Sequence, residues 1–137
     1  MKKTLGLFAI ALSLVAGAPA FAATDSTATI ACVGTAVNAR ETAIGTAITT
    51  HTQAINAAYT ARAAALQQAY TGTTQIQVKA SIKTAWASFR TAKTSANAAW
   101  KKSKDSAWTT FKNAARVCKA PASISDALNA SSEIANQ

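Results

Sequence analysis

The side chains that could carry out chemistry are few in this chain of 137 residues. A hydrolytic site needs a nucleophile, a general base and an orienting acid in one place. The chain has one histidine, His51, and five carboxylates, of which Asp25, Asp126 and Glu133 lie near its ends. No two carboxylates have a spacing suited to acid–base catalysis, and His51 with two cysteines makes a poor set of metal ligands. The sequence therefore predicts a protein that is not an enzyme and that holds no metal or cofactor.

Positive charge offers a different chemistry, the binding of anions. The formal net charge is +9, and ten of the 14 lysines and arginines lie between residues 79 and 119, where Asp105 is the one acid. A basic helix interleaved with Trp86, Trp100 and Trp108 is suited to lipopolysaccharide, acidic wall polymers, phospholipid headgroups or nucleic acid, although no specific nucleic-acid motif is present. The alternative is a solvated face that keeps an alanine-rich protein in solution. The candidate anion-binding residues are Lys79, Lys83, Arg90, Lys93, Lys101, Lys102, Lys104 and Lys112.

A second group of polar side chains consists of Arg40, His51 and Arg62, which follow one another at intervals of eleven residues. At the period of a helix they fall between a valine and isoleucine column and columns of alanine, so they lie within an apolar arc. Cations in that position need partners. Which partners they have depends on the elements that carry them.

Apolar residues recur at the same period of eleven through both halves of the chain. The columns are Val33, Ile44, Ile55 and Leu66 in the first half, and Val78, Phe89, Trp100 and Phe111 in the second. Eleven residues complete about three helical turns, so each column runs nearly straight along a helix, and the abundant alanine is the strongest helix former. The sequence therefore predicts an all-α fold with two long helices, at about residues 31–70 and 76–119. A turn at 71–75 joins them, and Gly72 can take the left-handed conformation that ends a helix.

The two cysteines define how these helices pair. Cys32 and Cys118 are centred on residue 75, next to the predicted turn, so an antiparallel helical hairpin brings them level. Because a disulfide needs Cα atoms within about 7 Å, the spacing predicts a Cys32–Cys118 bond that closes the open end of the hairpin. In this register, residues whose numbers sum to about 150 face one another.

The register also gives partners to the cations. Arg40 faces Phe111, His51 faces Trp100 and Arg62 faces Phe89. We expect these pairs to form a ladder of cation–π or stacking contacts that fixes the register, which a uniform alanine interface cannot do. In the alternative interpretation, the same side chains extend outward along the flank of the interface.

The interface between the helices is rich in alanine, which allows close approach but buries little apolar area. Two solutions are open. The disulfide compensates, or the hairpin pairs with a second copy into a four-helix bundle, or both. A paired hairpin would serve as a self-associating structural subunit of the envelope.

The first residues predict export. Lys2 and Lys3 precede an apolar run at 5–15 and the cleavage pattern Ala20-Phe21-Ala22, which is typical of a signal peptide, here over residues 1–22. The hairpin then spans residues 23–120 in the periplasm or outside the cell, where disulfides persist. Residues 121–137 form a tail that is either a short helix or mobile.

Threonines also keep the eleven-residue spacing in the first half of the chain, at Thr49, Thr60 and Thr71. Alanine-rich helices with threonine at this period resemble type I antifreeze proteins. The resemblance covers the first helix alone, and Asn38 stands at the first place of the threonine column. It implies ice binding as a minor alternative function.

Overall fold

The computed structural model describes residues 22–130, with side chains from Thr27 onward. The predicted signal peptide, residues 1–22, lies outside this range except for Ala22, as do residues 131–137 of the predicted tail. The described part contains helix α1 (Ala22–Ala69), helix α2 (Gln75–Val117) and a 3₁₀ helix, η1 (Ala127–Asn129). It contains no strand, and the prediction of an all-α fold is confirmed.

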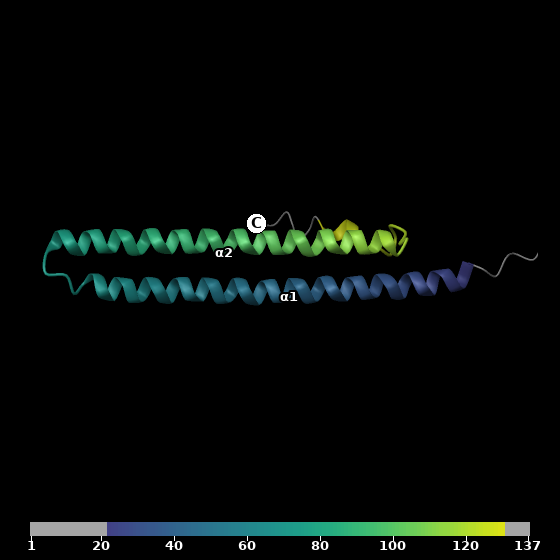
Figure 1. Cartoon of the computed structure of the whole chain (residues 1–137), viewed down its shortest axis with the longest axis horizontal. Coiled ribbons are helices and arrows are strands. Elements are labelled where there is room, and N and C mark those ends of the chain that lie inside the picture. Colours follow the sequence, from purple (N-terminus) through teal and green to yellow (C-terminus); the bar gives the residue numbers. More distant parts are fainter. Residues whose placement is uncertain (1–21, 131–137) are drawn as a thin grey trace, which may run out of the picture.

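Helices α1 and α2 lie side by side and run antiparallel (Figure 1). α1 begins about nine residues before the predicted start near residue 31, since neither glycine nor proline interrupts the alanine and threonine of that stretch. The ten residues before Cys32 extend about 15 Å at 1.5 Å per residue. Between residues 22 and 130, no helix is long and apolar enough to cross a membrane.

The connection between the helices differs from the prediction at Gly72. No described glycine has a positive φ, so Gly72 is not left-handed. α1 ends instead by tightening into i to i−3 bonds, among them Gly72 N–H donating to Ala69 O at 3.3 Å. A Cβ on Gly72 would lie 3.2 Å from Val78 Cγ2, so a larger residue here would require the Val78 side chain to shift by a few tenths of an ångström. α2 then starts at the cap residue Thr74, whose side-chain oxygen accepts the Gln77 N–H at 3.3 Å.

At the other end of α2, the left-handed residue is Lys119, with φ of 54°. The Ala120 N–H donates to Ala115 O at 3.1 Å and the Lys119 N–H to Arg116 O at 3.0 Å, which is the Schellman pattern of a helix C-terminus. Pro121 follows and prevents the helix from continuing. The tail therefore turns back sharply at this point.

The Cys32–Cys118 disulfide joins the start of the paired region of α1 to the end of α2, with a Cα–Cα distance of 5.8 Å. This confirms the predicted closure of the hairpin at its open end. The alanine columns of both helices are buried along the interface, namely Ala36, Ala47, Ala58 and Ala69 on α1 and Ala85, Ala96 and Ala107 on α2.

Larger side chains form a cluster at the disulfide end of the hairpin. Ile44, Trp108 and Phe111 are buried there, and Ala127 and Ala130 of the tail pack against them. In Figure 1 the tail, drawn in yellow, lies back along the end of α2. The tail up to Ala130 is thus part of the fold, and it covers one side of the hairpin near the disulfide.

Candidate functional site

The register predicted from the cysteines brings the three ladder pairs together. Arg40 Cζ lies 4.6 Å from the centroid of the Phe111 ring. Arg62 Cζ lies 4.5 Å from the centroid of the Phe89 ring. The guanidinium groups therefore lie across the interface on the aromatic rings of α2 and do not extend outward along its flank.

Each arginine also meets a tryptophan three residues before the phenylalanine. Arg40 Cζ lies 4.2 Å from the Trp108 ring centroid, and Arg62 Cζ lies 4.7 Å from that of Trp86. The Arg40–Trp108 contact is not among the facing pairs that the sequence predicts. The i, i+3 spacing of Trp and Phe, repeated after 22 residues, is the signal that reveals it.

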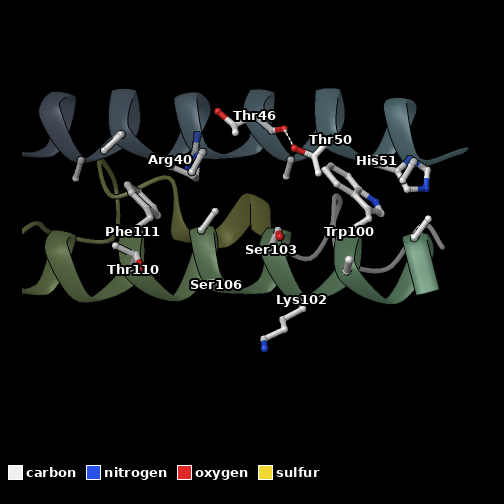
Figure 2. Close-up of a pocket in the computed structure, with 18 of the residues that line it drawn as sticks. Arg40, Thr46, Thr50, His51, Trp100, Lys102, Ser103, Ser106, Thr110 and Phe111 are labelled. Carbon is white, nitrogen blue, oxygen red and sulfur yellow. Dashed lines mark hydrogen bonds between the residues drawn. The ribbon is translucent and has the colours of Figure 1, made fainter. Parts of the chain in front are cut away.

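His51 lies between the two arginines and contacts Trp100 less closely. The ring centroids are 6.0 Å apart, with an angle of 39° between the planes. His51 Nε2 also lies at hydrogen-bonding distance, 2.9 Å, from Asn97 Oδ1 (Figure 2 shows the His51 and Trp100 rings). In the described structure, His51 is therefore held by a side-chain amide and an aromatic ring.

Arg40 is the most enclosed of the three, with 7% of its surface exposed. Its guanidinium forms ion pairs with the adjacent Glu41 and, at 2.8 Å, with Asp126 Oδ2 of the tail. Burial disfavours the charged form, but the bonds to Glu41 and Asp126 outweigh it and raise the pKa of Arg40. Hydrogen bonds from Asn129 and then from Arg40 lower the pKa of Asp126. Both groups are therefore charged across the physiological range, and they anchor the tail to α1.

Arg62 has no such acid. Its Nε is buried without a hydrogen-bond acceptor, and within the described part of the chain no carboxylate pairs with it. Three rings surround it, because Tyr59 adds a contact of 4.8 Å to those of Trp86 and Phe89. Tyr59 and Phe89 in turn meet edge to face, with centroids 4.9 Å apart.

Four of the predicted anion-binding residues form one column along α2, at intervals of eleven residues. This basic column consists of Lys79, Arg90, Lys101 and Lys112, and all four side chains are exposed. Lys83 is exposed near it, and Lys93 is half-buried with its Nζ 5.6 Å from the Phe89 ring centroid. Lys102 is exposed and points away from α1 (Figure 2).

Lys104 does not belong to this exposed surface, contrary to the prediction. Its side chain is 1% exposed, and its Nζ lies 5.5 Å from the Trp100 ring centroid. The reason is its column: Lys104 follows Lys93 by eleven residues, beside the helix interface, whereas Lys101 faces outward. A count of cations along the chain does not separate the column of Lys93 and Lys104 from the exposed basic column that contains Lys101.

Two grooves, of about 740 and 460 Å³, lie between the helices. Ladder residues form part of both, namely Arg40, His51, Trp100 and Phe111 in the larger and Arg62 and Phe89 in the smaller. The larger one is lined mainly by alanine, serine and threonine of both helices (Figure 2). Its hydroxyls are partly engaged, as where Thr50 Oγ1 donates to Thr46 O at 2.9 Å. No carboxylate is among the residues that line either groove.

The threonine column that resembles antifreeze proteins is incomplete in the structure. Thr49 and Thr60 are exposed on α1, but Thr71 lies beyond the end of that helix. Thr49 Oγ1 donates to Gly45 O at 3.0 Å, and Thr71 Oγ1 donates to Gln68 O at 2.8 Å. The column therefore presents two aligned hydroxyls on a helix.

Among residues 22–130, no three His, Cys, Asp or Glu side chains gather where they could hold a metal ion. The candidate site is instead a surface: the ladder, the rings around it and the basic column of α2. Comparison of the chain with protein-family models, curated proteins and solved structures finds no match.

Proposed function

We propose that this protein is an exported, non-enzymatic helical hairpin that binds an anionic polymer or membrane surface of the cell envelope through the basic column of α2. The observation that carries the proposal is the column itself: four exposed cations in line, at a constant interval, with no acid among them. The disulfide supports export, because such bonds persist in oxidising compartments.

The spacing of the basic column favours an extended ligand. Eleven residues of helix rise about 16 Å, so the column from Lys79 to Lys112 is about 50 Å long. Neighbouring cations are separated by more than the Debye length of about 8 Å at physiological salt, so no small anion feels two of them at once. A polymer or a surface with many negative groups engages all four, and the contributions add along the molecule.

The test is binding of the oxidised protein to vesicles containing phosphatidylglycerol and, separately, to polyphosphate. We expect binding to weaken steeply between low and high salt. Replacing Lys79, Arg90, Lys101 and Lys112 by glutamine should reduce binding at least tenfold. The matched control replaces Lys83, Lys102, Arg116 and Lys119, which removes the same charge outside the column. Equal losses in the two variants, or binding that ignores salt, would exclude the column as the binding element.

A second candidate function is self-association as a structural subunit. Large apolar side chains are exposed on the ladder side of the hairpin, among them Ile48 at 51%, Tyr59 at 45% and Trp86 at 40%. Pairing two hairpins would cover them. Light scattering of the oxidised protein tests this, since a concentration-dependent mass of two or more chains supports the subunit and a constant mass of one chain opposes it. Ice binding is the minor candidate, tested by thermal hysteresis.

A further inference from the structure

Two sites along the hairpin are built alike. The Arg40 cage consists of Arg40, Trp108 and Phe111, and the Arg62 cage consists of Arg62, Tyr59, Trp86 and Phe89. Moving 22 residues forward along α1 and 22 back along α2 takes the first cage onto the second. The contacts agree, with guanidinium-to-ring distances of 4.2 and 4.6 Å in one cage and 4.7 and 4.5 Å in the other.

The Arg40 cage is filled by the tail of this chain. Asp126 pairs with the guanidinium, and Ala127 and Ala130 pack on the cluster that contains Trp108. Trp108 is only 4% exposed as a result. The occupant of this cage is thus a carboxylate followed by a short apolar turn.

The Arg62 cage has the same walls but no such occupant in the described structure. The residue equivalent to Glu41 is Ala63, and the Arg62 Nε is buried without an acceptor. Trp86 stays exposed, whereas its counterpart Trp108 is covered. Tyr59 is exposed as well, whereas the residue equivalent to it, Val37, is partly buried. Stacking on rings engages the faces of a guanidinium, but the rings supply no hydrogen-bond acceptor in its plane, where the N–H groups point.

The charge around the Arg62 cage suits an acid. Lys83 and Arg90 lie three residues before and four residues after Trp86, so they neighbour it on the surface of α2, and both are exposed. A carboxylate accepts two parallel N–H bonds from an arginine, which neither water nor a neutral amide matches in strength.

We propose that the Arg62 cage is a docking site for an acidic segment of a partner protein. An Asp or Glu carboxylate of the partner binds the Arg62 guanidinium, and the apolar residues that follow it cover Trp86 and Tyr59. This is the arrangement that Asp126 and the residues after it make at the Arg40 cage. None of the cage residues belongs to the basic column, although Arg90 of that column neighbours Trp86. The proposal extends the function proposed above and does not depend on it.

The probe is a fluorescently labelled peptide with the sequence of residues 121–130, titrated with the oxidised full-length protein and followed by anisotropy. A second peptide carries Asn at the position of Asp126. We expect the acidic peptide to bind at least tenfold more tightly than the Asn peptide. Arg62→Gln should lower its affinity at least tenfold, whereas the matched control Lys102→Gln, which removes one exposed charge away from the cage, should lower it no more than threefold.

A gain-of-charge variant tests the same site without removing any contact. Ala63→Glu supplies the acid that Glu41 supplies at the Arg40 cage, so it should satisfy Arg62 and lower peptide affinity at least tenfold. Ala64→Glu adds the same charge at an exposed position of α1 and should have little effect. If Arg62→Gln lowers the helicity, the Ala63→Glu variant and the Asn peptide still decide the question.

Several results would overturn the proposal. Peptide binding that is absent, that is equal for both peptides, or that falls equally in Arg62→Gln and Lys102→Gln excludes a specific carboxylate site. Binding insensitive to Arg62→Gln would mean that the peptide displaces the tail from Arg40. Loss of vesicle binding in Arg62→Gln without any peptide binding would assign the cage to lipid. None of these results bears on the basic column, whose own variant reports on it.

Discussion

Removal of the disulfide should destabilise the hairpin strongly. The bond joins residues 86 positions apart, and in the chain-entropy model a loop of about 87 residues restricts the unfolded chain by about 4 to 5 kcal/mol. Replacing Cys32 and Cys118 by serine removes this restriction. Unfolding entropy is about 2.1 cal/mol/K per residue, or about 0.23 kcal/mol/K for the 109 residues from 22 to 130. The expected fall in melting temperature is therefore about 20 °C.

The expected fall in melting temperature is large because the helix interface contributes little stability that could compensate for the lost disulfide. Its buried columns are largely alanine, and the large buried side chains gather at the disulfide end. Circular dichroism at 222 nm during heating measures the difference between the oxidised protein and the double serine variant. Reductant should lower the melting temperature of the first and leave the second unchanged. A fall of less than about 5 °C would refute the view that an alanine interface of this length depends on its covalent closure.

Three further outcomes follow from the contacts. Asn129 and Arg40 lower the pKa of Asp126, so the Asp126 carboxylate stabilises the docked tail above the ordinary value of 3.8, and this stabilisation is lost as pH falls through the lowered pKa. The NMR resonances of the tail should shift in that pH range. The Asp126→Asn variant should show the shifted resonances already at neutral pH. Arg40→Gln removes the guanidinium contacts with the Trp108 and Phe111 rings and should cost about 1 to 3 kcal/mol in urea unfolding. Glu41 and Asp126 contribute little to this cost, because both carboxylates are partly exposed to solvent. Ala58→Leu overfills the interface and should cost about 1 to 3 kcal/mol in the same assay, while Ala64→Leu on the exposed face should stay within about 0.5 kcal/mol.

The register of the hairpin could be predicted from the sequence because a helix has a constant rise and a constant number of residues per turn. Once Cys32 and Cys118 are placed level, the constant rise and period of two helices determine which residues face one another far from the disulfide. The contacts of Arg40 with Phe111 and of Arg62 with Phe89 follow from this constant geometry, without any knowledge of how the side chains pack.

Features that depend on irregular backbone could not be predicted in the same way. The ion pair of Asp126 with Arg40 arises because the chain reverses at Lys119 and Pro121, and no period in the sequence encodes that path. Burial of Lys104 has a different cause, because this residue lies on the regular helix α2. Its column runs beside the helix interface, and a count of charges along the chain ignores that position. The sequence allows Gly72 to be left-handed, but its φ is not positive, and the glycine instead lies close to the Val78 side chain.

The equal repeat of the two helices makes the length of the hairpin adjustable in paired steps. Residues 44–54 of α1 face residues 97–107 of α2, and each segment is one repeat of three turns. Excising both segments shortens the rod by about 16 Å and removes the His51–Trp100 pair together. The disulfide and both arginine cages keep their partners. An insertion or deletion in one helix alone would instead slide every facing pair past its partner, so a chain of this design changes length by matched changes on both sides of its turn.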